Sequence, residues 1–388
     1  MKAHQSKIEK LISELCPNGA EFKELVECAS IKRGRRVTKS ELSPEKKYPV
    51  YSGGVTPMGY FEKHNQPANT LTVVKYGTAG FVNFITEDFW ANDVCYCIKP
   101  GVALNNKYLF FVLKSKQAFI QSQATNAIPA HLPTEVIESI KIPIPPLEIQ
   151  EEIVKILNSF TELEAELEAE LEARKKQYRH YLEELLNVEA VQLKALNEII
   201  VPTQNIKWKR ETDKTYKYID LTSVSRDDHG ISQTVDIDSD SAPSRAQKLI
   251  KKDDVIFATT RPTLQRYALI DDIYNDQVAS TGYCVLRADK KEVLSKWIYF
   301  NIASSRFNDY VEKNQEGSAY PGISDSKVKD FKIPLPTLSE QERIVSILDK
   351  FDALVNDISI GLPAELSARR QQYEYYRGKL LTFKEHVK

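Results

Sequence analysis

Apolar residues recur every three or four positions along two long stretches of the chain. The first stretch follows Pro145-Pro146, a pair that cannot lie inside a helix. Its apolar positions are Ile149, Ile153, Ile156, Leu157, Phe160, Leu163, Leu167, Leu171, Tyr178, Leu182 and Leu185. This spacing predicts one amphipathic helix from about Glu148 to about Leu186. At about 1.5 Å per residue it would be roughly 58 Å long, which favours a coiled coil.

The second stretch nearly repeats the first. Residues 141–160, KIPIPPLEIQEEIVKILNSF, return as residues 332–351, KIPLPTLSEQERIVSILDKF. A repeat separated by about half the chain indicates a duplicated domain, because solenoid repeats have periods of roughly 20 to 50 residues. Ser339 and Glu342 form a capping-box pattern at the start of the second helix.

The two helices differ in one place. Phe351 and Ala368 are 17 positions apart, whereas their counterparts Phe160 and Ala173 are 13 apart, and the extra residues fall around Gly361-Leu362-Pro363. Glycine and proline together predict an interruption of the second helix. An insertion of four residues is about one turn, so the apolar phase is restored afterwards.

Short β-rich runs punctuated by glycine precede each helix. In the first block these runs are 50–52, 71–74, 81–85 and 94–98, and in the second they are 218–221, 255–258 and 284–286. A helical stretch from Lys107 to Phe111 matches one from Lys296 to Phe300. The fold class expected is therefore mixed α/β, with two tandem globular domains separated and followed by long helices.

The expected domains are 1–147 and 188–338, each followed by a helix, at 148–187 and 339–385. Two long helices with apolar seams suggest that they pack on each other as an antiparallel coiled coil. The two blocks would then lie at opposite ends of a rod, related by an approximate two-fold axis. The blocks have diverged much further in sequence than the helices, which indicates that the helices must stay alike while the blocks are free to differ.

Composition excludes several classes of protein. The chain has 388 residues, 42% hydrophobic and 28% charged, as in a globular protein. No apolar run approaches the roughly 20 residues of a membrane span, and the start, MKAHQS, lacks a signal-peptide core, so we expect no membrane partner and a cytoplasmic location. Cys95 and Cys97 alternate along a strand and read as core residues. The six scattered histidines give no metal signal.

A net charge of −1 conceals a segregation of charge along the chain. Lys32-Arg33-Gly34-Arg35-Arg36 and Lys207-Trp208-Lys209-Arg210 are basic clusters in the two blocks. The first helix is acidic, with glutamate at every second position from Glu162 to Glu172. Near-neutral total charge therefore does not argue against a nucleic-acid partner. The glutamates could form a partner surface, or only the solvated sides of a coiled coil.

The order of variable block, repeated Ile-Pro-x-Pro-x-Leu-x-x-Gln-x-x-Ile-Val-x-Ile-Leu helix, second variable block and second such helix resembles the specificity subunit of type I restriction-modification systems. The resemblance covers the whole chain. It implies that the blocks are target recognition domains, each reading half of an interrupted, asymmetric site in double-stranded DNA. It also implies that the helices, 150–186 and 341–381, act as spacer and docking surface for two modification subunits, which methylate adenine, and that restriction subunits can join.

The same resemblance implies that this chain binds no cofactor itself, and that S-adenosylmethionine and ATP with magnesium belong to the partner subunits. The apolar seam could pair within the chain or dock partner helices. Its candidate residues are Ile153, Leu157, Phe160, Leu167, Tyr178, Ile344, Leu348, Phe351 and Tyr373.

Polar loops that follow apolar strands are the candidates for DNA contact. In the second block Thr259, Thr260, Arg261, Thr263, Gln265 and Arg266 follow the strand at 255–258. In the first block Lys75, Tyr76 and Thr78 follow the strand at 71–74. Arginine and glutamine make bidentate contacts to guanine and adenine, and threonine can bond phosphate or contact a thymine methyl. Arg33, Arg35, Arg36 and Arg245 are candidates for phosphate contact.

Each of these assignments has a plainer alternative. The loops could be solvated hairpin turns, and the arginines could be a solvated surface run. Ile128-Pro129-Ala130 and Tyr320-Pro321-Gly322 occupy similar places before the repeated motif and favour tight turns. Two other functions are alternatives, a purely architectural coiled-coil scaffold and a stand-alone DNA methyltransferase. The second lacks an Asn-Pro-Pro or Asp-Pro-Pro motif, and the P-loop of a translocase is absent as well.

Overall fold

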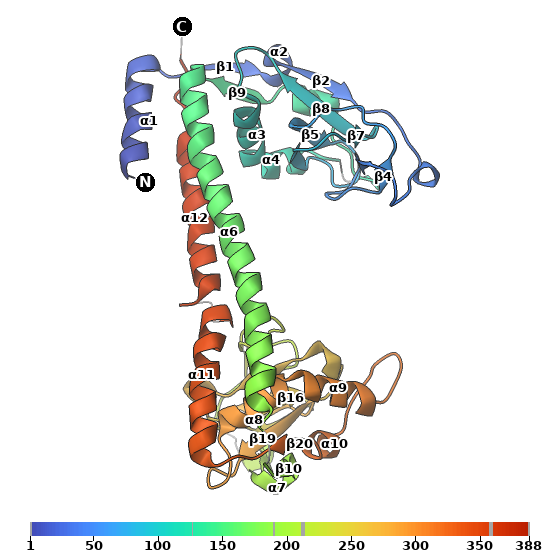
Figure 1. Cartoon of the computed structure of the whole chain (residues 1–388), viewed down its shortest axis with the longest axis vertical. Coiled ribbons are helices and arrows are strands. Elements are labelled where there is room, and N and C mark those ends of the chain that lie inside the picture. The colour runs from blue at the N-terminus through green and yellow to red at the C-terminus, as the bar shows by residue number, and fades with distance from the viewer. Residues whose placement is uncertain (1, 126, 189–190, 211–213, 357–359, 387–388) are drawn as a thin grey trace. The chain divides into compact units, whose positions relative to one another are not determined.

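The computed structural model describes residues 2–125, 127–188, 191–210, 214–356 and 360–386 (Figure 1). They form two compact units. Unit 1 comprises Met1–Ala165 and Ala368–Lys388, and unit 2 comprises Glu166–Ser367. The boundary falls inside helix α6 (Leu147–Leu186), so this helix contributes its first half to unit 1 and its second half to unit 2.

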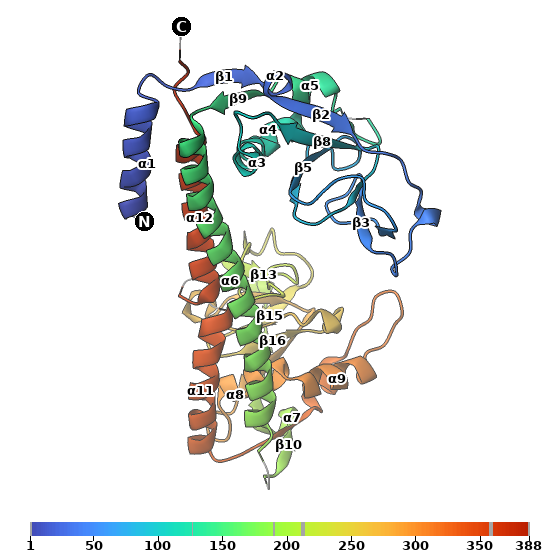
Figure 2. The ribbon, with the colours of Figure 1, turned by 45° about the horizontal axis from the view of Figure 1, so that its top comes forward.

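Unit 1 contains a four-stranded antiparallel sheet in the order β2-β8-β5-β6, a three-stranded sheet β4-β3-β7 and the antiparallel pair β1-β9 (Figure 1, Figure 2). Its strands are β1 (Glu21–Glu24), β2 (Ala29–Arg33), β3 (Tyr48–Tyr51), β4 (Tyr60–Phe61), β5 (Thr70–Val74), β6 (Val82–Ile85), β7 (Trp90–Ala91), β8 (Cys95–Pro100) and β9 (Lys141–Ile144). Its helices are α1 (Lys2–Leu15), α2 (Leu25–Cys28), η1 (Lys39–Glu41), α3 (Asn106–Ser115), α4 (Gln117–Ser122) and α5 (Thr134–Glu138).

Unit 2 contains a four-stranded antiparallel sheet β11-β19-β16-β17, a five-stranded sheet β12-β15-β18-β13-β14 and the pair β10-β20. Its strands are β10 (Leu193–Ala195), β11 (Ile200–Val201), β12 (Gln204–Asn205), β13 (Tyr216–Ile219), β14 (Val235–Ile237), β15 (Ala246–Leu249), β16 (Val255–Ala258), β17 (Tyr267–Leu269), β18 (Val278–Ser280), β19 (Tyr283–Ala288) and β20 (Lys332–Pro334). Its helices are α7 (Leu196–Ile199), η2 (Trp208–Arg210), η3 (Pro262–Leu264), η4 (Asp272–Tyr274), α8 (Ser295–Ala303), α9 (Ser305–Asn314), α10 (Asp325–Lys329) and α11 (Leu338–Asn356).

The four-stranded sheets of the two units have the same strand order, with β2, β8, β5 and β6 matching β11, β19, β16 and β17. In each unit a helix rich in large apolar residues packs in the core: α3 carries Tyr108 and Phe111, and α8 carries Trp297 and Phe300, all fully buried. The predicted match between these two helical stretches is confirmed. The mixed α/β fold class and the duplication are confirmed as well, although the loop sequences have little in common.

The repeated Ile-Pro-x-Pro segment is held by this core helix in both units. The hydroxyl of Tyr108 donates to the carbonyl of Pro143 at 3.3 Å, and the indole N–H of Trp297 donates to the carbonyl of Pro334 at 2.8 Å. These prolines lie in β9 and β20, the strands that lead into α6 and α11. A buried aromatic polar group needs a partner, and a carbonyl in the repeated segment supplies it in each case.

Long helices pack side by side within each unit. In unit 1, Phe160 of α6 stacks on Tyr376 of α12 (Leu362–Leu381) at 5.6 Å, and Glu164 pairs with Arg370 at 2.6 Å. In unit 2, the α6 residue Tyr181 stacks on Phe351 of α11 at 5.2 Å. Residue numbers rise along α6 as they fall along α12, so the unit 1 pair is antiparallel, as predicted.

The interruption predicted in the second helix is confirmed, since α11 ends at Asn356 and α12 begins at Leu362. Helix α1 was not predicted; it packs its Ile8 into the unit 1 core. The seam residues Ile153, Leu157, Ile344 and Leu348 are buried in the cores of their own units. Phe160 and Tyr178 are largely buried, and Leu167, Phe351 and Tyr373 are half-buried. No helix in the described part of the chain has the length and apolarity needed to cross a membrane.

Candidate nucleic-acid interface

Two candidate loops leave the same end of the unit 1 sheet. Arg33 of β2 and Val73 of β5 both pair with Tyr96 of β8, so β2 and β5 end at the same edge of the sheet. Just beyond it, the backbone N–H of Gly34 donates to the carbonyl of Cys95 at 3.1 Å. The basic cluster 33–36 and the loop 75–80 are therefore brought together by the register of the sheet.

The basic cluster is fixed by its backbone and leaves its side chains free. The N–H of Arg35 donates to the carbonyl of Ala91 at 2.9 Å, and the indole N–H of Trp90 donates to the carbonyl of Arg35 at 2.7 Å. A Cβ on Gly34 would lie 2.2 Å from the carbonyl oxygen of Ala91, so only glycine fits. The exposed side chains of Arg33, Arg35 and Arg36 have no hydrogen-bond or ion-pair partner among the described residues, which leaves their guanidinium groups available to phosphate.

The loop after β5 carries Lys75, Tyr76 and Thr78 at different depths. Lys75 is only 5% exposed, and its Nζ lies 5.3 Å from the ring centre of Tyr96 and 5.5 Å from that of Tyr76. Thr78 donates both its N–H and its hydroxyl to the carbonyl of Gly53, at 2.8 and 3.0 Å. Tyr76 and Thr78 lie on the surface, and Lys75 lies beneath them. A DNA contact by Lys75 stays a prediction.

A hairpin closed by Thr125 and His131, of which residue 126 lies outside the described residues, lies against this loop. The rings of Tyr76 and His131 stack at 5.6 Å, and the two residues form a β-bridge. The N–H of Gly77 donates to the carbonyl of Ala130 at 3.2 Å. The sequence predicted a tight turn at Ile128-Pro129-Ala130. It did not indicate that this turn would lie against the candidate loop, nor that His131 would join the site.

Unit 2 repeats the arrangement with different side chains. Thr259 donates its N–H and its hydroxyl to the carbonyl of Gly282, at 2.8 and 2.9 Å. The N–H of Arg261 donates to the carbonyl of Pro321 at 2.7 Å, and its guanidinium lies 4.8 Å from the ring centre of Tyr320. Thr260 forms a β-bridge to Gly322. A second hairpin, 316–322, therefore lies against the second candidate loop. Tyr320, which the sequence indicated only as part of a tight turn, joins the site.

The remaining unit 2 candidates divide into exposed and anchored side chains. Thr260, Arg261 and Thr263 are exposed. Gln265 is anchored, because its amide donates to Oδ1 of Asn308 at 2.7 Å. Arg266 is also anchored, through a hydrogen bond from Nη1 to the carbonyl of Leu221. We therefore expect Gln265 and Arg266 to shape the loop, and their direct contact with bases stays a prediction.

Arg245 lies at the same end of unit 2. Its carbonyl accepts the N–H of Thr281 at 2.8 Å, one residue before the Gly282 carbonyl that holds Thr259. The Arg245 side chain is exposed. The phosphate candidate and the loop candidates are thus neighbours in unit 2, as they are in unit 1.

Cys95 and Cys97 of unit 1 are packing residues, as predicted. Cys95 and Cys97 are buried, and burial raises the pKa of each thiol to about 12. Both are therefore protonated and unreactive at neutral pH. The described residues hold no group of three or more His, Cys, Asp or Glu side chains placed to bind a metal ion.

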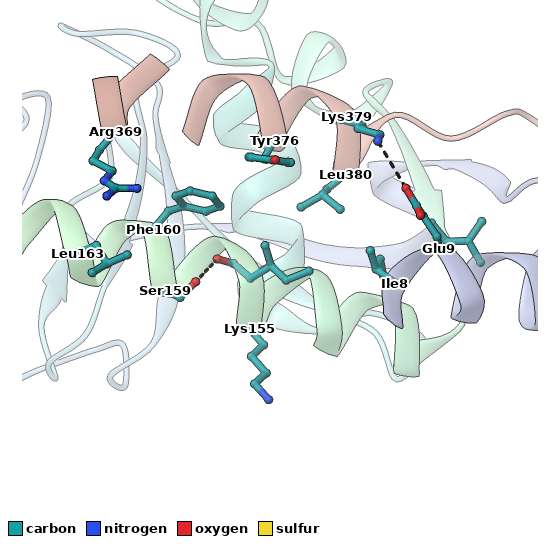
Figure 3. A pocket seen from close by; sticks show the side chains of 12 residues that line it. Ile8, Glu9, Lys155, Ser159, Phe160, Leu163, Arg369, Tyr376, Lys379 and Leu380 are labelled. Carbon is teal, nitrogen blue, oxygen red and sulfur yellow. Dashed lines mark hydrogen bonds and ion pairs between the residues drawn. The ribbon is translucent and has the colours of Figure 1, made fainter. Parts of the chain in front are cut away.

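A separate groove of about 350 Å³ lies among α1, α6 and α12 of unit 1 (Figure 3). Its lining is mainly apolar, with Ile8, Ile156, Phe160, Leu163, Tyr376 and Leu380 among its residues. An ion pair between Lys379 and Glu9, with Nζ and Oε1 3.6 Å apart, lies at its edge. An apolar groove between helices is suited to accept the apolar face of another helix.

Comparison with known proteins identifies the family to which this architecture belongs. The family model of the type I restriction modification DNA specificity domain matches residues 17–173 and again 187–368. The chain is 30% identical to a putative type I restriction enzyme specificity subunit of Haemophilus influenzae, covering 99% of this chain and 100% of that one. It is 35% identical to the EcoR124I/EcoR124II specificity subunit of Escherichia coli, over 63% of each chain.

The fold also matches a solved structure. This structure is the crystal structure of the type I restriction-modification S subunit from Mycoplasma genitalium. The match covers 93% of this chain and 96% of that one, with a TM-score of 0.61 and 18% sequence identity. That identity supports likeness of fold alone. Together with the two family-model matches and the full-length relative, the observations show that the chain belongs to the type I DNA specificity family and is the specificity subunit of a type I restriction-modification system.

Proposed function

We propose that the chain reads an interrupted, asymmetric site in double-stranded DNA, with one recognition domain for each half-site. The domains are 1–147 and 188–338, and the loop clusters at their sheet ends make the contacts. The observation that carries this proposal is that both units build the same sheet end and place different side chains on it. Tyr76 and Gly77 stand in one unit where Thr260 and Arg261 stand in the other. Two domains that carry different side chains on the same backbone framework are suited to read different base sequences.

Phosphate and base contacts divide between two kinds of residue in this proposal. Arg33, Arg35, Arg36 and Arg245 neutralise phosphates, which holds each domain on the duplex without reading sequence. The exposed loop side chains read base edges. Of these, Arg261 has the bidentate geometry that suits guanine, and the threonines suit phosphate oxygens or a thymine methyl.

The helical segments 148–187 and 339–385 act as a spacer between the two recognition domains. When two recognition domains are linked, binding of one half-site raises the effective concentration of the other domain at its own half-site. Two weak interactions then give one specific binding event. The domains must meet compatible groove faces about one helical turn, roughly 34 Å, apart. The length of the helices then sets the gap in the target site, and the loops set its bases.

Two modification subunits bind the helices and carry S-adenosylmethionine, and restriction subunits with ATP and magnesium join them, in the cytoplasm. The groove among α1, α6 and α12 supports this, because it offers apolar surface around Phe160 that a partner helix can cover. The half-buried Leu167, Phe351 and Tyr373 are further candidates for that contact. In this assembly the present chain directs adenine methylation and restriction to its site.

A genome-wide map of N6-methyladenine tests the proposal in the source bacterium. Deleting this gene should remove one interrupted, non-palindromic motif, and restoring the gene should bring that motif back. A map that does not change, with the partner genes shown to be expressed, would contradict the proposal and favour an architectural scaffold.

A further inference from the structure

The hairpins beside the two candidate loops are built alike. Thr125 and His131 close the first, with the Thr125 N–H donating to the His131 carbonyl at 2.9 Å. Glu316 and Gly322 close the second through reciprocal bonds of 2.8 and 2.9 Å. Both closing pairs are six positions apart in the sequence. Little sequence is shared between them, so the common geometry indicates a common task.

Each hairpin is also tied to its candidate loop in the same way. The N–H of Leu132 donates to the carbonyl of Lys75 at 2.8 Å, and the N–H of Ile323 donates to the carbonyl of Thr259 at 2.9 Å. These bonds come directly after the hairpin in the chain and directly after β5 or β16 in the sheet. These bonds tie the base of each hairpin to the reading loop beside it.

Each hairpin exposes a large apolar or aromatic side chain immediately before a proline, although not at the same position, because the closing bonds match Tyr320 to Pro129 and Ile128 to Ala319. Ile128 is fully exposed, and Tyr320 is 74% exposed even though the Arg261 guanidinium lies against its ring. Their surroundings are polar, with Thr260 and Arg261 exposed beside the second tip. Single exposed apolar side chains are common on protein surfaces, but one placed beside each candidate reading loop is suited to meet an apolar surface on a ligand.

The apolar surface that DNA offers is the face of its bases. Proteins insert apolar side chains between base steps when they bend or open a duplex. Enzymes that modify a base must take it out of the stack, which leaves a space between its neighbours. Tyrosine can stack on a base at that space, and isoleucine can fill it by contact.

We propose that each hairpin inserts its tip into the base stack of its half-site, and that Ile128 and Tyr320 fill the space vacated by the adenine to be methylated. This inference rests on the proposed function. It adds a second role to the specificity subunit, since the chain then helps to hold the target base out of the duplex as well as reading the sequence around it.

The test uses the complex of the full chain with its modification subunits, and duplexes in which 2-aminopurine replaces the target adenine in one half-site. The variants are Ile128→Ser and Tyr320→Ser. The matched controls are Val102→Ser in unit 1 and Ile273→Ser in unit 2, because both residues are exposed and apolar and neither lies in a hairpin or candidate loop. A Tyr320→Phe variant keeps the ring and removes the hydroxyl.

We expect each tip variant to reduce the binding-induced rise in 2-aminopurine emission at one half-site only, by about threefold or more. On duplexes with adenine at that position it should lower kcat for methylation there, while KM stays within about twofold. The controls and Tyr320→Phe should behave as the wild-type complex does. Wild-type emission and kcat in both serine variants would overturn the inference, and so would equal losses at both half-sites. A wild-type complex without sequence-specific binding would instead show that the proposed function itself fails.

Discussion

The side-chain oxygen of Gln150 accepts a hydrogen bond from the backbone N–H of Asn105 at 2.8 Å. The amide nitrogen of Gln150 donates to the carbonyls of Ala103 and Pro145, at 2.9 and 2.7 Å, and the side chain is fully buried. Gln341 makes the equivalent three bonds in unit 2, to Leu294, Glu292 and Pro336. This glutamine therefore fastens the start of each long helix to the loop before the core helix.

Replacing Gln150 by leucine should destabilise unit 1. Leucine preserves much of the volume but leaves one backbone N–H and two carbonyls buried without these bonds. Each such loss costs about 1–3 kcal/mol, so we expect the free energy of unfolding to fall by about 3 kcal/mol or more. Urea unfolding followed by circular dichroism measures the change. Gln371→Leu, at an exposed position of α12, is the control and should shift stability by less than about 0.5 kcal/mol. Equal effects of the two substitutions would refute the fastening role.

Gly77 should tolerate no side chain. It has a φ of +92°, and a Cβ there would lie 2.5 Å from the carbonyl oxygen of Gly53. Gly77→Ala should therefore displace the loop that carries Tyr76 and Thr78, and weaken binding to the first half-site by about tenfold or more. Gly378→Ala, where a Cβ meets nothing within 4 Å, should leave DNA binding unchanged. Filter binding or fluorescence anisotropy with the partner complex compares them. Equal affinity of the Gly77→Ala and wild-type complexes would show that the loop position does not matter.

Removing any one of Arg33, Arg35 or Arg36 should change the salt dependence of DNA binding and leave the motif unchanged. A phosphate contact contributes about 0.9 to the slope of log affinity against log salt, so each Arg→Ala variant should reduce that slope by about this amount. Arg343→Ala provides the control, because Arg343 is exposed on α11 and paired with Glu340. An altered methylation motif would assign the arginine to base reading. An unaltered slope would leave it as a solvated surface residue.

His229 should make unit 2 sensitive to mild acid. Burial lowers its pKa from 6.5 to about 4, against the opposing effect of Asp228 and Asp227, and its ring stacks on Tyr267 at 3.8 Å. The unfolded chain therefore binds a proton near pH 6.5 that the folded chain does not bind until about pH 4. This contribution to stability is complete above pH 6.5 and is lost as the pH falls from 6.5 towards 4.

A His229→Phe variant, which keeps an aromatic ring and cannot titrate, should lose less stability than the wild type between pH 7 and pH 5. Urea midpoints at these two pH values measure the difference. Identical losses in the two proteins would show that His229 does not sense pH.

The sequence predicted the long helices well because their information is local and repeated. The spacing from Ile149 to Leu185 indicates α6 within a residue of its observed bounds, and Gly361 with Pro363 marks the break between α11 and α12. Helix α1 was missed although Ile8, Leu11, Ile12 and Leu15 have helical spacing. That pattern is short, and it lies before the duplicated part of the chain, so no repeat supports it.

The candidate interface was predicted only in part, because it depends on contacts between distant segments. The loops after β5 and β16 were identified from their polarity and position. The burial of Lys75 against Tyr96 and the anchoring of Gln265 by Asn308 depend on partners 21 and 43 positions away. Likewise, the hairpin residues His131 and Tyr320 join the loops through ring contacts that no local pattern encodes. The repeated Gln150 and Gln341 were visible in the sequence, but their role required the loop that they hold.

The central claim is that each loop cluster reads its own half-site, and a methylation map of a loop variant tests it most directly. The gene is replaced in the source bacterium by a version with Thr260, Arg261 and Thr263 changed to alanine, and N6-methyladenine is mapped across the genome. The account predicts that one half of the interrupted motif is relaxed or lost, while the other half and the spacer length stay as in the wild type. A change in both halves, or a fully methylated and unaltered motif, would contradict it.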